Sequence, residues 1–103
     1  MSDAPPLLEI VFAGPVIEWR GPAPFFFVAL PDDHAEAVRA AARAASYGWG
    51  VVPVTATIGA TRFTTSLLPR AGGYLLPLKD KVRRAAGLVL GDVAVVVMRV
   101  DAT

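Results

Sequence analysis

The stretch VVPVTATIGATRFTTSLLPRAGGYLLPL, residues 51–78, decides the fold class of this chain. Residues 51–58 and 61–68 are rich in β-branched residues, and Gly59-Ala60 between them suits a tight turn with positive φ at its first central residue. Residues 69–73 are typical of a loop, and residues 74–78 of a short strand. We therefore expect a hairpin and a third strand within a mainly β domain.

The segment that precedes this stretch adds more strands. Residues 7–13 are expected to form a strand, with Leu8, Ile10 and Phe12 on one face and Glu9 on the other. Gly14-Pro15 follows, and because proline cannot donate to a strand ladder we expect a bulge or bend there before the strand resumes at residues 16–19. Residues 25–30 form a further strand that is apolar on both faces.

Two helical segments alternate with the strands. Residues 34–45 are alanine-rich and helix-prone, and an aspartate of Pro31-Asp32-Asp33 is placed to cap the helix. Its expected buried stripe is Ala35, Val38, Ala42 and Ala45.

The second helix covers residues 79–86, with Leu78, Val82, Ala85 and Ala86 facing inward, and it ends at Gly87. A turn at Gly91-Asp92 leads into the last strand, residues 93–100. These elements predict a small six-stranded β-barrel or pseudo-barrel with two short helices, formed by residues 7–103 after a flexible tail at residues 1–6.

Composition narrows the class of protein. With 103 residues, 54% of them hydrophobic, the chain has the material for one domain with a core. The longest apolar runs hold about six residues, against the roughly 20 of a membrane helix, so we expect no membrane association. The chain has no cysteine, which excludes disulfides and thiolate chemistry and fits a cytoplasmic protein.

Charge and hydropathy bear on partners. A net charge of +1 argues against a dedicated nucleic-acid binder. A mean hydropathy of +0.51 implies that some strands are buried on both faces, inside a closed barrel or in a subunit interface. The sequence leaves open whether the protein is a monomer or a homodimer.

Motifs for catalysis, cofactors and metals are absent. There is no phosphate loop, GxGxxG, HExxH or GxSxG pattern, and His34 is the only histidine. We therefore expect no catalytic residue, cofactor or metal site. The adjacent carboxylates of Asp32 and Asp33 suit a helix start better than acid–base chemistry.

Two sets of residues are candidates for binding. Glu18, Trp19 and Arg20 end an otherwise apolar strand, and Trp49 and Tyr74 lie next to turns. We expect these five residues to line a ligand site at the barrel mouth, although Glu18 could instead pair with an arginine and the aromatic rings could belong to the core.

The second set is Lys79 and Arg83, which are four residues apart on one helix face. They could bind an anion or a partner, or form an ordinary solvated helix face.

Most of the chain also carries a family resemblance. The motifs GWGxVPV, TSLxP, GGYxLP, KxxVRxAxGL and GD occur in this order within residues 48–92, and FAGPVIEWRGPAPFFFVALP covers residues 12–31. These stretches resemble the bacterial domain-of-unknown-function family numbered nineteen-oh-five. The resemblance implies a double-split β-barrel and no established activity. Some members precede a second domain associated with bacteriocin protection.

A second resemblance covers residues 76–100 only. LPLKDKVRRAAGLVLGDVAVVV is similar to the strand–helix–turn–strand unit of AbrB/MazE-type swapped-hairpin proteins, which bind DNA as dimers. The near-neutral charge of this chain argues against transferring the DNA-binding role.

Three functions follow as hypotheses. The first is a module that binds a small molecule or peptide at the barrel mouth. The second is a DNA-binding or regulatory dimer that meets phosphate with the basic helix at residues 79–84. The third is an enzyme that relies on carboxylates such as Glu18.

Overall fold

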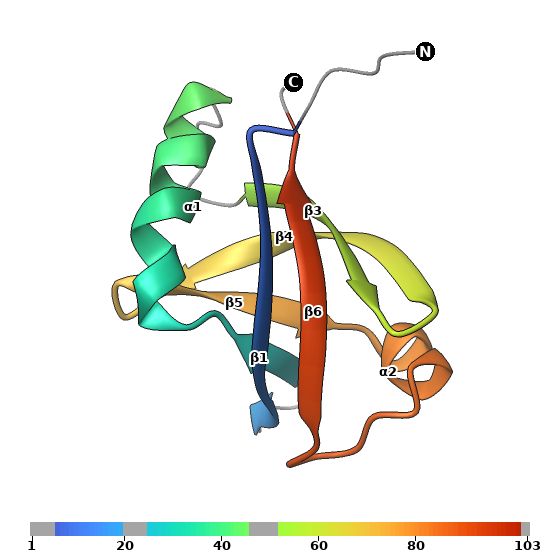
Figure 1. The fold of residues 1–103 in the computed structure, drawn as a ribbon. Helices are drawn as coiled ribbons and strands as arrows, with labels where there is room; N and C mark the ends of the chain where they lie inside the picture. The colour runs from blue at the N-terminus through green and yellow to red at the C-terminus, as the bar shows by residue number, and fades with distance from the viewer. Residues whose placement is uncertain (1–5, 20–24, 46–51, 102–103) are drawn as a thin grey trace.

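The computed structural model describes residues 6–19, 25–45 and 52–101, and six of its segments are strands that close into an antiparallel barrel (Figure 1). The strand order around the barrel is β1-β2-β5-β4-β3-β6. The elements are β1 (Leu8–Trp19), β2 (Phe25–Ala29), α1 (Asp32–Ala44), β3 (Val52–Ile58), β4 (Thr61–Arg70), β5 (Gly73–Leu78), α2 (Asp80–Ala85) and β6 (Val93–Val100). The prediction of a mainly β, six-stranded barrel with two helices is confirmed.

Strand β1 is continuous and changes its partner in the middle. Residues 8–15 pair with β6, and residues 16–19 pair with β2. The predicted interruption at Gly14-Pro15 is therefore wrong: Pro15 stays in the strand, opposite Val93, the first residue of β6. A residue without an N–H suits the point at which the strand leaves one partner for the next.

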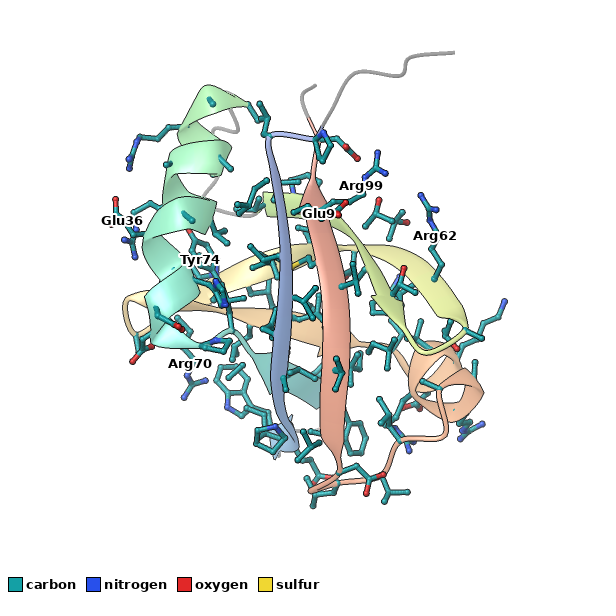
Figure 2. All side chains as sticks on the ribbon, viewed as in Figure 1. Glu9, Glu36, Arg62, Arg70, Tyr74 and Arg99 are labelled. Atoms are coloured by element: carbon teal, nitrogen blue, oxygen red, sulfur yellow. The ribbon has the colours of Figure 1, made fainter. Side chains whose placement is uncertain are left out.

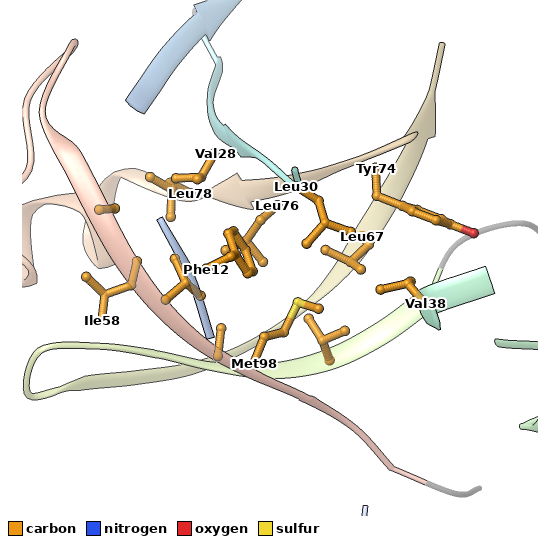
Figure 3. Close-up of a cluster of buried hydrophobic side chains, with 14 of the residues drawn as sticks. Phe12, Val28, Leu30, Val38, Ile58, Leu67, Tyr74, Leu76, Leu78 and Met98 are labelled. Atoms are coloured by element: carbon orange, nitrogen blue, oxygen red, sulfur yellow. The ribbon is translucent and has the colours of Figure 1, made fainter. Parts of the chain in front are cut away.

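The barrel interior is filled by alternate residues of the strands (Figure 3). On β6 the inward side chains are Ala94, Val96, Met98 and Val100, each at most 1% exposed. Their neighbours Val93, Val95 and Val97 face outward and are exposed. Barrel closure therefore buries only the inner face of β6.

Helix α1 starts earlier than predicted and is not capped by a side chain. Pro31 is the N-cap residue, and Asp32 and Asp33 lie in the first helical turn, where the helix dipole favours carboxylates. The predicted aspartate cap is therefore wrong. The buried stripe contains Ala41 in place of the predicted Ala42, which is only half-buried.

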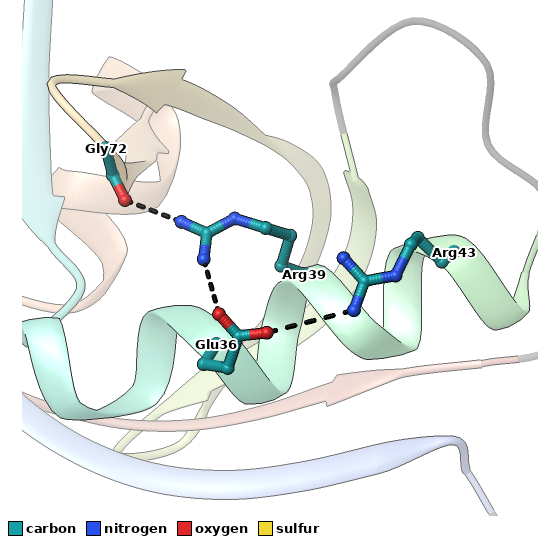
Figure 4. Close-up of polar contacts among 4 residues, drawn as sticks. All are labelled: Glu36, Arg39, Arg43 and Gly72. Atoms are coloured by element: carbon teal, nitrogen blue, oxygen red, sulfur yellow. Dashed lines mark hydrogen bonds and ion pairs between the residues drawn. The ribbon is translucent and has the colours of Figure 1, made fainter.

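An arginine joins α1 to the turn between β4 and β5 (Figure 4). Arg39 Nη1 donates to Glu36 Oε2, three residues earlier on the helix, over 2.8 Å, and Arg39 Nη2 donates to the carbonyl oxygen of Gly72 over 2.7 Å. Arg43 approaches the other oxygen of Glu36 at 3.8 Å. One guanidinium therefore bridges the helix and a hairpin that is distant in sequence.

The two hairpin turns that lie within the described residues, β3–β4 and β4–β5, use left-handed backbone. Gly59 has φ of 58°, as predicted for the first central residue of its turn. The loop predicted at residues 69–73 is wrong: β4 continues to Arg70, β5 begins at Gly73, and only Ala71 and Gly72 connect them, with φ of 51° and 81°. Two central residues with positive φ are typical of a tight hairpin turn.

Helix α2 is a short connection beside the barrel end. Val82 and Ala86 pack against the core from partly buried positions, but Ala85, which we expected to face inward, is exposed. Gly87, with φ of 68°, follows the helix as predicted. Neither helix in the described part of the chain is long and apolar enough to cross a lipid bilayer.

Gly14 leaves little room for a side chain, and we predict that Gly14→Ala lowers the free energy of unfolding by about 1–3 kcal/mol. A Cβ at Gly14 would lie 3.2 Å from the carbonyl oxygen of Ala29 and 3.2 Å from Val28 Cγ1. Gly73→Ala is the matched control, since its added Cβ would meet nothing closer than 3.7 Å. Urea unfolding of both variants measures the difference, and equal stabilities would contradict the close approach at Gly14.

Candidate functional site

A pocket of about 250 Å³ opens where β2 begins, β5 ends and α2 begins. The residues that line it are Phe25, Phe26, Leu78, Lys79 and Asp80. Phe26 and Leu78 lie opposite each other across the β2–β5 pair, so strand pairing fixes the apolar part of the wall. The pocket combines two exposed charged residues with an apolar surface.

The end of β1 lies beside this pocket. Glu18 is paired with Phe26, and Trp19 is paired with Phe25, in the antiparallel register of β1 and β2. The partner change within β1 is what brings these two residues to the pocket, because only residues 16–19 of β1 pair with β2. Glu18 is half-buried there.

Three aromatic side chains form a ledge on the outer face of the barrel, next to the pocket. This aromatic ledge consists of Trp19, Phe25 and Phe27. The Trp19 and Phe27 rings meet edge to face with centroids 5.6 Å apart, and the Phe25 and Phe27 centroids are 6.5 Å apart. Phe27 is 4% exposed, whereas Trp19 is 43% and Phe25 58% exposed. The Phe27 ring is therefore buried, and the rings of Trp19 and Phe25 are accessible to a ligand.

A cation covers part of this ledge. The guanidinium carbon of Arg70 lies 3.7 Å from the centroid of the Trp19 ring, a cation–π geometry. Figure 2 shows Arg70 near the β4–β5 turn, at the side of the barrel. Arg70 therefore holds the indole in place, and the pairing was not evident from the sequence because the two residues are far apart in the chain.

Arg83 packs against the underside of the pocket wall. Its guanidinium carbon lies 4.4 Å from the Phe26 ring centroid, Nη1 donates to the carbonyl oxygen of Leu88 over 3.2 Å, and Nη2 lies 3.6 Å from Asp80 Oδ1. The side chain is 17% exposed, and among the described residues its buried Nε has no hydrogen-bond partner. These contacts clamp α2 to the barrel.

The structure brings together residues that the sequence placed in two separate sites. Glu18 and Trp19 from the predicted ligand set adjoin the pocket, while Lys79 from the predicted anion set lines it and Arg83 supports it. Lys79 is exposed and makes no ion pair with another described residue.

Tyr74 does not lie at the pocket. It is 8% exposed, its ring belongs to the core and its hydroxyl points away from that cluster, beside α1 (Figures 2 and 3). The structure therefore places the Tyr74 ring in the core and not in the lining of this pocket, apart from the other predicted site residues Glu18 and Trp19. Arg20 and Trp49 lie outside the described residues, as does the expected tail except for Pro6.

Sequence reasoning missed most of the pocket wall. The sequence predicts residues 25–30 only as a strand that is apolar on both faces and does not single out its first residue, Phe25, which is exposed. The signal that could have found it is position: the first residues of a strand lie at the barrel rim, where apolar side chains stay accessible. The contribution of Leu78 and Asp80 depends on tertiary pairing that no local pattern contains.

Metal binding finds no support within the described ranges 6–19, 25–45 and 52–101. They contain no group of three histidine, cysteine, aspartate or glutamate side chains placed to hold an ion. His34 instead packs at the core, with its ring centroid 6.5 Å from that of Phe12.

Comparison with known proteins gives a family and no activity. A family model described as a domain of unknown function (DUF1905) matches residues 12–98, which includes parts of all six strands. No curated protein matches the chain. The resemblance of residues 76–100 to AbrB/MazE-type proteins stays a prediction.

The contacts of Arg83 predict a structural role for this side chain. Arg83→Ala should lower the free energy of unfolding by about 1–3 kcal/mol, because it removes a hydrogen bond from a charged group and a cation–π contact. Arg84→Ala, which changes an exposed residue of the same helix, should stay within about 0.5 kcal/mol of the parent. Chemical denaturation measures the free energy of unfolding of both variants. If Arg83→Ala left it unchanged, the contacts of Arg83 would not stabilise the packing of α2 on the barrel.

Proposed function

The chain belongs to the family described as a domain of unknown function (DUF1905), and from that premise we propose that it is a binding module for a small molecule or peptide that presents an apolar group and an anionic group together. The observation that carries this proposal is the pocket at the β2–β5–α2 junction, whose wall is apolar and has one lysine at its edge.

The charge at the wall favours an anionic ligand. Asp80 is engaged by Arg83, with 3.6 Å between Oδ1 and Nη2. Lys79 has no such partner among the described residues, so its ammonium group is the charge that a ligand would meet. A carboxylate next to Lys79 would gain a charge-assisted hydrogen bond.

The size of the pocket favours a small apolar group. Ligand pockets typically measure about 300–1,000 Å³, and this one, at about 250 Å³, has room for little more than one ring. The exposed rings of Trp19 and Phe25 extend the apolar surface beyond the pocket. A peptide that ends in an aromatic residue would place its side chain in the pocket and its terminal carboxylate near Lys79.

Binding without catalysis is the simpler proposal for this site. The lining residues include one carboxylate, that of Asp80, which lies 3.6 Å from Arg83, and no hydroxyl or thiol nucleophile and no second carboxylate is among these described residues. DNA binding gains no support from the fold, since Arg83 turns from the basic helix toward Phe26 and not toward solvent. A cytoplasmic location stays a prediction of the cysteine-free composition.

Titration with a matched pair of probes tests the proposal. We expect phenylacetate, added to ¹⁵N-labelled protein, to shift the amide signals of Phe25, Phe26 and Lys79, with millimolar affinity. Phenylacetamide, which has the same ring and no charge, should bind about two- to five-fold more weakly, the size of one exposed ion pair. The measurement is the dissociation constant of each probe from the chemical-shift titration.

Two variants make the test specific. Lys79→Gln should remove the preference for phenylacetate, whereas Lys81→Gln, an exposed position of α2, should leave it unchanged. If neither probe shifts the pocket signals at 10 mM, or if the shifts map elsewhere, the proposal fails. If the parent chain bound both probes with equal affinity, the proposal that the ligand carries an anionic group would be wrong.

A further inference from the structure

The outer face of β1 and β6 carries an exposed apolar surface that belongs to neither the pocket nor the aromatic ledge. Three cross-strand pairs make it up, and we refer to them together as the valine face: Val11 with Val97, Ala13 with Val95, and Pro15 with Val93. All six residues are exposed, and the four valines are 41–66% exposed. Val89 and Leu90, at 59% and 56%, extend the exposed apolar surface along the loop before β6.

Nothing in the described chain covers this face. Figure 1 shows β1 and β6 side by side at the front of the barrel, with α1 on one side and α2 on the other. The inner faces of the same strands already fill the core, so the barrel has no further surface with which to bury the outward valines. Exposed apolar patches of this kind on small proteins mark interaction sites.

We propose that the valine face binds a second copy of this chain and forms a two-fold homodimer. The three pairs contain no charged side chain, so a surface that buries them must itself be apolar. A second valine face meets that requirement, since rows of β-branched residues on two sheets pack face to face in sandwiches.

The charges around the face allow two copies to meet. Glu9 and Arg99 lie opposite each other one pair beyond Val11 and Val97 on the outer face, so the rim has both signs. Figure 2 shows both labelled residues at the same end of β1 and β6. The formal net charge of the chain is +1, which leaves little repulsion between two copies.

The apolar area of the valine face determines how tightly we expect the dimer to associate. Full burial of a valine or leucine side chain contributes about 1.5–3 kcal/mol. At about 25 cal/mol per Å² of buried apolar surface, this energy corresponds to roughly 60–120 Å² for each side chain. The half-exposed residues of the valine face and the adjoining loop therefore offer about 300 Å² of apolar surface. A standard interface buries about 800 Å² per partner, so the polar rim must supply the rest. We expect a weak dimer with a dissociation constant of roughly 10–300 μM.

Sedimentation equilibrium of the full chain from 5 to 500 μM tests the dimer. The parent chain should move from its monomer mass of 10.8 kDa toward twice that mass as concentration rises. Val95→Lys places a charge at the centre of the face and should weaken the dimer at least about tenfold. Ala40→Lys, which adds the same charge at an exposed position of α1, should leave the dimer unchanged.

A milder variant guards against loss of folding. Val97→Thr keeps the branched shape and adds one hydroxyl, so it should fold as the parent does by circular dichroism and still weaken the dimer several-fold. A parent chain that stays at 10.8 kDa up to 500 μM would overturn the proposal. A dimer that survives both Val95→Lys and Val97→Thr would also overturn it, because the contact would then lie elsewhere.

Discussion

The exchange of partners within β1 is the interaction on which the rest of this structure depends. Its first eight paired residues form a ladder with β6, and its last four form a ladder with β2. Strand β1 thus joins the two sheets on one side of the barrel, and β4 joins them on the other, since its residues 61–67 pair with β3 and its residues 68–70 pair with β5. Without β1 in both ladders, β2 and β6 would each end a sheet at an open edge. The exchange needs Gly14 at the crossing point, because any side chain there would meet the backbone of Ala29.

Closure through β1 also separates the two surfaces that we consider functional. The last residues of β1 adjoin the pocket at the β2–β5–α2 junction, with Trp19 on the aromatic ledge. The earlier residues of β1 contribute half of the valine face together with β6. Ligand binding and dimerisation therefore use different parts of one strand, and either proposal can fail without the other.

Much of the fold could be predicted from local sequence patterns, and most of the site could not. Alternation identified the strands, and Gly59-Ala60 identified a hairpin, because both signals depend only on neighbouring residues. The partner exchange in β1 and the packing of the Tyr74 ring in the core depend on contacts between distant segments. The same is true of the pocket, where Phe26 meets Leu78 only through β2–β5 pairing.

The most direct test of this account is the pattern of nuclear Overhauser contacts between strands in the labelled chain. We expect cross-strand contacts from Gly14 to Ala94 and, in the same molecule, from Ile17 to Phe27, which together show one strand in two sheets. If β1 instead ended near Gly14, with no contacts between residues 16–19 and β2, the barrel would not close, and the account would be contradicted.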